Sequence, residues 1–194
     1  MKTALITGST SGIGLGIARE FAREKYNIVF NGLEANGAEI AADIGKEFGI
    51  EVMFSSANML KPNEIKTMVE NGIKKFGVID VLINNAGIQF VSPIEDFPED
   101  KWNAIIAINL TSAFHTTKYV WNKMKEQKFG RIINIASAHG LVASEFKSAY
   151  VASKHGIVGF TKTIALEGAP LGITANAICP GYVKTPLVEK QIVD

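Results

Sequence analysis

The chain has 194 residues, 47% apolar and 20% charged, which is typical of one globular domain with a sizeable core. Its 20 Lys and Arg nearly balance its 19 Asp and Glu, so neither a nucleic-acid-binding stripe nor an acidic arm is expected. The sequence has no run of about 18 apolar residues and enters a strand at once, so we expect no membrane span, no leader and a cytoplasmic location. One cysteine and three dispersed histidines exclude an internal disulfide and show no metal-ligand spacing, so no metal is expected.

Short β-branched runs alternate with longer amphipathic segments along the chain. The runs predict strands at Thr3–Ile6, Asn27–Phe30, Glu51–Ser55, Val81–Asn84, Arg131–Ile135 and Thr174–Ile178. The segments between them predict helices near Gly14–Arg23, Asn36–Phe48, Asn63–Phe76, Pro98–Gln127 and Ala149–Gly168. Strands that alternate with helices indicate right-handed crossovers, and nearly continuous apolar strands indicate helices on both faces. The predicted fold is a doubly wound parallel α/β sheet with three layers, α/β/α, in a single domain over residues 1–194.

A glycine-rich loop joins the first strand to the first helix and reads Thr7-Gly8-Ser9-Thr10-Ser11-Gly12-Ile13-Gly14. Unpaired N–H groups and the dipole at a helix N-terminus favour an anion, and glycine lets the backbone approach a phosphate closely. Taken alone, such a loop can be a plain tight turn. Because it follows the first strand and opens a helix, it has the context of a dinucleotide site, so the loop predicts a Rossmann fold.

The residues after the second strand bear on the choice between NAD and NADP. They read Asn31-Gly32-Leu33-Glu34, and no Lys or Arg lies between Asn27 and Lys46. An acidic residue in this region commonly binds the ribose hydroxyls of NAD, whereas an Arg accommodates the 2′-phosphate of NADP. Glu34 stands beyond the strand end, so NAD is favoured because a positive partner for NADP is absent.

Three polar residues further along predict acid–base chemistry. Tyr150 and Lys154 are four residues apart, so they share one face of a helix. A neighbouring ammonium favours the phenolate and lowers the phenol pKa, which suits Tyr150 to accept an alcohol proton. Ser137 follows the strand Arg131–Ile135 and can hydrogen-bond the reacting oxygen. A Tyr/Lys pair is often a surface pair and a Ser after a strand is often a cap. Their order behind the glycine loop favours alcohol/carbonyl interconversion.

These motifs resemble those of the classical short-chain dehydrogenase/reductase superfamily: TGxxxGxG at Thr7–Gly14, NNAG at Asn84–Gly87, Ser137, YxxxK at Tyr150–Lys154, and Pro180-Gly181. The resemblance implies an NAD-dependent oxidoreductase in which Asn109, Ser137, Tyr150 and Lys154 are catalytic. It also implies that Asn109 kinks its helix and holds a water that joins Lys154 to a proton relay.

The same resemblance implies a set of cofactor contacts. They come from Gly8, Thr10, Ser11, Gly12, Ile13, Gly14, Asn58, Asn85, Ala86, Gly87, Tyr150, Lys154, Pro180, Gly181, Val183 and Thr185. Asn58 stands where the superfamily usually has an Asp against adenine, and its side-chain oxygen can accept the same hydrogen bond.

Residues near the predicted active site indicate a small carboxylate substrate. Gln89, His139, Lys147 and Gln191 supply amide, imidazole and ammonium donors. Taken singly, His139 can cap a loop and Lys147 can be a solvated cation. Together they resemble the D-3-hydroxybutyrate dehydrogenases within the superfamily. That resemblance implies that these four residues, with Ser137 and Tyr150, bind 3-hydroxybutyrate or acetoacetate.

Members of the superfamily usually continue beyond the point that matches Asp194. The further part supplies the rest of the substrate lid, a helix and a final strand, and it forms the interface of a homotetramer. We therefore expect a fold that lacks this strand and helix, with Thr174–Ile178 as an exposed edge. Two alternatives to an active 3-hydroxybutyrate dehydrogenase stay open. One is a truncated nucleotide-binding relic without activity, and the other is a 3-oxoacyl reductase of the same superfamily that uses NADPH.

Overall fold

A single parallel six-stranded sheet organises the chain. The structure is a computed structural model, which describes residues 1–183. Neighbouring strands all pair in parallel, in the order β3-β2-β1-β4-β5-β6. The strands are β1 (Thr3–Ile6), β2 (Asn27–Asn31), β3 (Val52–Ser55), β4 (Val81–Asn84), β5 (Gly130–Ile135) and β6 (Ile173–Ile178). The predicted doubly wound sheet is confirmed, and each strand begins and ends within one residue of its expected position.

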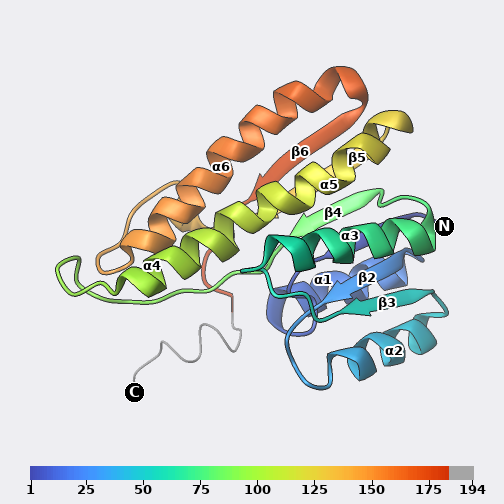
Figure 1. Ribbon diagram of the computed structural model, residues 1–194, viewed down its shortest axis with the longest axis horizontal. Helices are drawn as coiled ribbons and strands as arrows, with labels where there is room; N and C mark the ends of the chain where they lie inside the picture. The colour runs from blue at the N-terminus through green and yellow to red at the C-terminus, as the bar shows by residue number, and fades with distance from the viewer. Residues whose placement is uncertain (184–194) are drawn as a thin grey trace.

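Helices cover both faces of this sheet (Figure 1). They are α1 (Gly12–Arg23), α2 (Gly37–Phe48), α3 (Pro62–Phe76), α4 (Glu99–Ile106), α5 (Ser112–Glu126) and α6 (Ser148–Gly168). Short helical turns are η1 (Ala107–Thr111), η2 (Ala138–Gly140) and η3 (Ala169–Leu171). Buried side chains of α1 and α2 pack on one face, and those of α3, α5 and α6 pack on the other.

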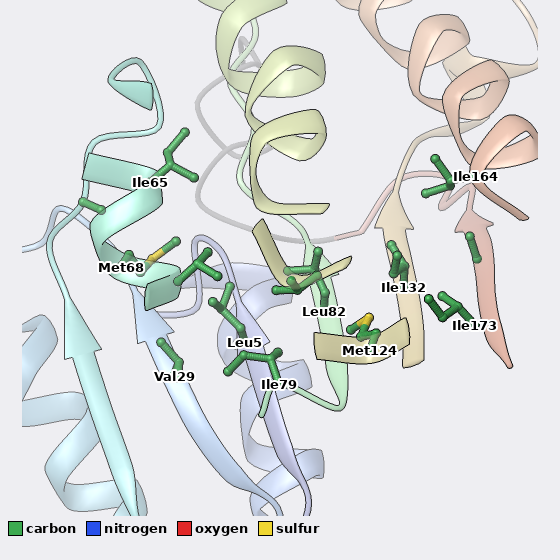
Figure 2. Packing of buried hydrophobic residues seen from close by; sticks show 14 of the residues in the cluster. Leu5, Val29, Ile65, Met68, Ile79, Leu82, Met124, Ile132, Ile164 and Ile173 are labelled. Atoms are coloured by element: carbon green, nitrogen blue, oxygen red, sulfur yellow. The ribbon is translucent and has the colours of Figure 1, made fainter. Parts of the chain in front are cut away.

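The larger core cluster fills the space between the sheet and the second group of helices. Figure 2 shows Leu5, Val29, Leu82 and Ile132 on four adjacent strands, in one cluster with Met68 of α3 and Met124 of α5. Their neighbours in sequence point to the opposite face, because successive side chains alternate across a strand. Each central strand is therefore buried on both sides, which explains its almost continuous apolar sequence.

The segment Pro98–Gln127, predicted as one helix, is interrupted. Its middle, η1, is a π-helical turn between α4 and α5. Such a turn accommodates an extra residue and is frequent at functional sites. Asn109 lies within it and is buried. The predicted helical segment is therefore built of three consecutive helical pieces, and the π-helical turn coincides with the residue expected to kink the helix.

The strand β6 forms one edge of the sheet, as expected from the sequence. Thr174, Asn176 and Ile178 are exposed along it. No helix within residues 1–183 combines the length and the apolar character needed to cross a bilayer.

Candidate active site

A cavity of about 400 Å³ opens where the carboxyl ends of the central strands meet. In a doubly wound sheet this is the edge at which ligands bind. The predicted residues that line it are Gly8, Ser11, Gly12, Ile13, Asn58, Asn85, Ala86, Gly87, Ser137, Tyr150, Lys154, Pro180, Gly181 and Val183. The fold therefore brings together the nucleotide loop and the predicted acid–base residues, which lie more than 120 positions apart in the sequence.

The glycine loop presents a helix N-terminus to this cavity. Gly8 and Gly12 have φ values of 61° and 53°, in the left-handed region that glycine adopts without strain. Ser11 is the N-cap of α1 and makes no side-chain hydrogen bond to the helix. The N–H groups of the first turn thus remain available to an anion, and this donor set fits a dinucleotide pyrophosphate.

Two predicted cofactor residues do not line the cavity. Thr10 is buried, and its hydroxyl donates to the Glu34 carboxylate. Gly14 is also buried, and a Cβ placed on it would lie 2.1 Å from the Gly8 carbonyl oxygen and 2.5 Å from Asn85 Nδ2. Gly14 therefore lets α1 pack against the loop. Thr10 and Gly14 act on the structure of the loop and do not line the cavity.

Asn31 and Glu34 also line the cavity, although neither belongs to the predicted set of cofactor contacts. Asn31 Oδ1 accepts a hydrogen bond from the Gly8 N–H at 3.2 Å, and its Nδ2 donates to the Ser55 and Ala57 carbonyls at 3.1 and 2.9 Å. It therefore ties together the loops after β1, β2 and β3. The signal in the sequence that could have identified Asn31 is its position, because it is a polar amide directly after the apolar residues of β2.

Glu34 lies against the glycine loop. Its carboxylate accepts hydrogen bonds from the hydroxyls of Thr10 and Ser11, the latter at 3.0 Å. Partial burial raises the pKa of Glu34, but these two bonds and backbone N–H donors outweigh it, so the pKa lies below its usual value. The side chain is therefore ionised at neutral pH and places a negative charge beside the loop.

Ser137, Tyr150 and Lys154 converge at the other end of the cavity. The segment after β5 carries Ser137, and α6 carries Tyr150 and Lys154. Lys154 Nζ lies 5.5 Å from the centroid of the Tyr150 ring and donates to the Ile135 carbonyl at 2.7 Å. One serine, one phenol and one amine thus face the same space, as the sequence predicted.

The pKa values of this group differ from the sequence-based expectation. Burial raises the pKa of Tyr150, and a hydrogen bond with Ser137 only partly opposes it. Burial lowers the pKa of Lys154 to about 8, against an opposing effect of Cys179. The expected lowering of the Tyr150 pKa by Lys154 is therefore wrong for the protein alone, because burial of the phenol dominates.

Asn109 connects the π-helical turn to the rest of the site. Its Oδ1 accepts from the Ile88 N–H at 2.9 Å, and its Nδ2 donates to the Ile88 carbonyl at 3.0 Å and to Ser153 Oγ at 3.1 Å. Ser153 in turn donates to the Tyr150 carbonyl at 2.8 Å. Asn109 therefore fixes the backbone of α6 at Tyr150 relative to the loop after β4. The expected water link to Lys154 stays a prediction.

Of the predicted substrate residues, His139 contacts Tyr150. The His139 ring lies edge-on to the Tyr150 ring with centroids 5.9 Å apart, and its backbone N–H donates to Ser137 Oγ at 3.1 Å. Lys147 is the N-cap of α6. Burial and then the Lys147 ammonium lower the pKa of His139. Gln89 is half-buried in the loop after β4.

Three further predictions concern the periphery of the site. The Asn58 side-chain oxygen, expected to contact adenine, already accepts a hydrogen bond from the Leu60 N–H at 2.9 Å. An amide oxygen has a second lone pair, so the expected contact is still compatible with this bond. Thr185 and Gln191 lie outside the described residues.

A buried chain of polar side chains runs beneath the site. Asn84 Nδ2 donates to Asn134 Oδ1 at 2.8 Å across β4 and β5, and Thr116 of α5 donates to Asn84 Oδ1 at 2.6 Å. Asn134 Nδ2 donates to Thr161 of α6 at 2.8 Å. This polar seam joins β4 and β5 to α5 and to α6, the helix that carries Tyr150 and Lys154.

Comparison with known proteins agrees with this geometry. The family model for short chain dehydrogenases matches residues 2–193. The chain belongs to the short-chain dehydrogenase family. It is therefore an oxidoreductase of a family that binds nicotinamide cofactors.

Two curated relatives of this short-chain dehydrogenase are named D-beta-hydroxybutyrate dehydrogenase. That of Cupriavidus necator is 60% identical, with 98% of this chain and 74% of the relative covered. That of Rhizobium meliloti is 58% identical, with 100% and 76% covered. A solved actinorhodin polyketide ketoreductase with NADPH has a TM-score of 0.93 and 38% identity, with 97% of this chain and 73% of that chain covered.

Proposed function

We propose that this short-chain dehydrogenase interconverts D-3-hydroxybutyrate and acetoacetate with NAD as its cofactor. The observation that carries the proposal is the position of His139, whose ring lies edge-on to the Tyr150 ring and close enough to Lys147 for the ammonium to lower the pKa of His139. A cation and an imidazole beside the predicted base offer donors to a carboxylate that is only a few bonds from the reacting carbon. The two relatives named D-beta-hydroxybutyrate dehydrogenase support this substrate.

The proposed proton transfer uses Ser137, Tyr150 and Lys154, which all line the cavity. The Tyr150 phenol first passes its own proton to a neutral Lys154, the resulting phenolate accepts the proton of the substrate hydroxyl, and Ser137 holds the same oxygen by a hydrogen bond. When bound, the nicotinamide supplies the hydride acceptor, or the donor in the reverse direction. Lys154 has a pKa of about 8, so its charged and neutral forms are both populated near that pH. Lys154 can therefore take up the proton and release it again.

The proposed carboxylate site is formed by Lys147, His139 and Gln89. The Lys147 ammonium supplies the charge, and the imidazole of His139 supplies a directed N–H donor. Because the pKa of His139 is lowered, the ring is mostly neutral at pH 7 and keeps one N–H. Gln89 follows the NNAG segment in the loop after β4 and adds an amide donor to the proposed set.

The preference for NAD rests on Glu34. Its ionised carboxylate lines the cavity beside the first turn of α1. A 2′-phosphate near this carboxylate meets a like charge, and the sequence from Asn27 to Lys46 offers no cation to offset it. Ribose hydroxyls, in contrast, can donate to the same carboxylate.

The deciding experiment measures NADH formation from NAD and D-3-hydroxybutyrate, with the L isomer and Tyr150→Phe as comparisons. Turnover of the D isomer with a loss of about 10²–10⁴-fold in Tyr150→Phe supports the proposal. Tyr119→Phe, the same change on α5 outside the cavity, serves as the matched control and should keep its activity. NADH binding without turnover supports the inactive relic, and turnover of an acetoacetyl thioester with NADPH supports the acyl reductase.

A further inference from the structure

The backbone is strained at Phe146, one residue before the N-cap of α6. Phe146 has a φ of 60°, a conformation in which Cβ crowds the following carbonyl oxygen. Its side chain is 53% exposed, so core packing does not impose this conformation. Bulky residues keep such a backbone only where their surroundings over-determine it, and these places cluster at functional sites.

Helix termination does not account for this residue. The other non-glycine residues with positive φ in the described chain are Lys25 and Lys128, at 61° and 53°. Each stands two positions after the end of a helix, α1 or α5, where a left-handed residue commonly ends a helix. Phe146 instead precedes a helix, because Lys147 is the N-cap of α6.

Hydrogen bonds fix both peptide groups that flank Lys147. The Phe146 carbonyl accepts from the Ser92 N–H at 2.9 Å, and the Lys147 carbonyl accepts from the Val151 N–H at 2.8 Å. The first bond joins the turn before α6 to the loop after β4, which also carries Gln89. The second is the first hydrogen bond of α6. The direction in which the Lys147 side chain leaves the backbone is therefore set by its neighbours.

We infer that the left-handed turn at Phe146, held by Ser92, is a specificity-determining positioning element that aims the Lys147 ammonium at the substrate carboxylate. The inference rests on the proposed function. The backbone conformation at Phe146 positions Lys147, and the aromatic side chain is not needed for this role. The turn acts through Lys147 and does not touch the reacting atoms.

Two substitutions separate the backbone from the side chain. Asn tolerates the left-handed region, so Phe146→Asn keeps the turn while it removes the ring. Val is β-branched and strongly disfavours positive φ, so Phe146→Val forces the turn open and breaks the bond from Ser92. Lys128→Val also places a β-branched residue at a position with positive φ, but far from the cavity. It therefore controls for a general loss of stability.

The kinetic test measures kcat and KM for D-3-hydroxybutyrate in these variants. Phe146→Val should raise KM roughly tenfold or more, the scale of one hydrogen bond to a charged group, with a much smaller change in kcat. The KM for the methyl ester, which has no carboxylate charge, should not change. Phe146→Asn should keep the KM of the original chain and raise the melting temperature by about 2–4 °C. Lys128→Val should lower the melting temperature and leave KM unchanged.

A second measurement does not depend on turnover. The described groups close to the His139 ring are Tyr150, Ser137 and Lys147. Moving the ammonium away should raise the pKa of His139, which NMR titration of the ring protons follows. Lys147→Met gives the full size of this rise, Phe146→Val should give a rise in the same direction, and Phe146→Asn should give none.

The two measurements distinguish the possible failures. If the unmodified protein does not oxidise D-3-hydroxybutyrate, the proposed function fails, while the His139 titration still tests the turn. If Phe146→Val folds and leaves both KM and the His139 pKa unchanged, the turn does not position Lys147 and the inference is overturned. Equal effects of Phe146→Asn and Phe146→Val on KM would also overturn it, because the side chain would then be the active feature.

Discussion

Two glycines in the first helix should respond to the same substitution in opposite ways. A Cβ on Gly14 would lie 2.1 Å from the Gly8 carbonyl oxygen and 2.5 Å from Asn85 Nδ2, whereas a Cβ on Gly16 meets nothing within 4 Å. Gly8 belongs to the backbone of the nucleotide loop. It cannot move aside as the end of a flexible side chain can.

The cost of Gly14→Ala follows from these contacts. Relief of the overlap requires a shift of about 1 Å, which carries the usual overpacking cost of about 1–3 kcal/mol. The same shift disturbs the hydrogen bond from Asn85 Nδ2 to the Gly8 carbonyl, which is 3.1 Å long and contributes about 1 kcal/mol. We expect Gly14→Ala to lose about 2–4 kcal/mol of unfolding free energy. Gly16→Ala should gain about 0.5–1 kcal/mol through helix propensity.

Urea denaturation followed by circular dichroism measures both variants on the same scale. NADH binding should weaken in Gly14→Ala, since the Gly8 carbonyl and the first turn of α1 move together, and should not change in Gly16→Ala. Two variants of equal stability, or a Gly14→Ala protein as stable as the parent, would falsify the close packing at Gly14.

Three further predictions concern single side chains. Because the folded pKa of Lys154 is about 8 and its ordinary value is 10.5, the unfolded chain binds more protons between these values and stability rises with pH. Across this pH range the unfolding free energy of the parent protein should rise by on the order of 3 kcal/mol relative to that of Lys154→Met. The same pH dependence in both proteins would contradict the depressed pKa of Lys154. Asn134→Leu leaves the Asn84 amide unpaired in the core and should cost about 2–4 kcal/mol in urea denaturation, with no loss refuting a structural role of the seam. Glu34→Gln should raise the ratio of kcat/KM for NADP to that for NAD roughly fivefold or more, and an unchanged ratio would exclude Glu34 from cofactor selection.

The periodicity of the sequence predicted the sheet and its helices because those elements depend on local patterns. The runs of β1, β4 and β5 are short and almost continuously apolar, and within two residues of each strand end lies a residue that lines the cavity: Gly8, Asn85 and Ala136. Motif order then predicted that Ser137, Tyr150 and Lys154 would share one space. Local spacing was enough here because parallel strands all end at the same edge.

Periodicity alone could not predict the interruption at Asn109, which was expected only from the resemblance to the superfamily. The partners of its side chain, Ile88 and Ser153, are 21 and 44 residues away, and helical periodicity contains no information on such contacts. The prediction that the pKa of Tyr150 is lowered was wrong for a related reason. The i, i+4 spacing placed Lys154 on the correct face, but it could not reveal the burial that dominates the phenol.

The polar seam beneath the site also bears on how the chain finds its fold. Asn84 and Asn134 stand directly opposite each other in the β4–β5 register. A slip of one residue would turn the Asn134 amide to the other face of the sheet and would break its hydrogen bonds with the buried Asn84 and Thr161 side chains. The same slip would displace Ser137 from Tyr150. The register slip that would misalign the active site thus also breaks buried hydrogen bonds, which lowers the stability of the misfolded chain. Chains that fold stably therefore have an aligned active site.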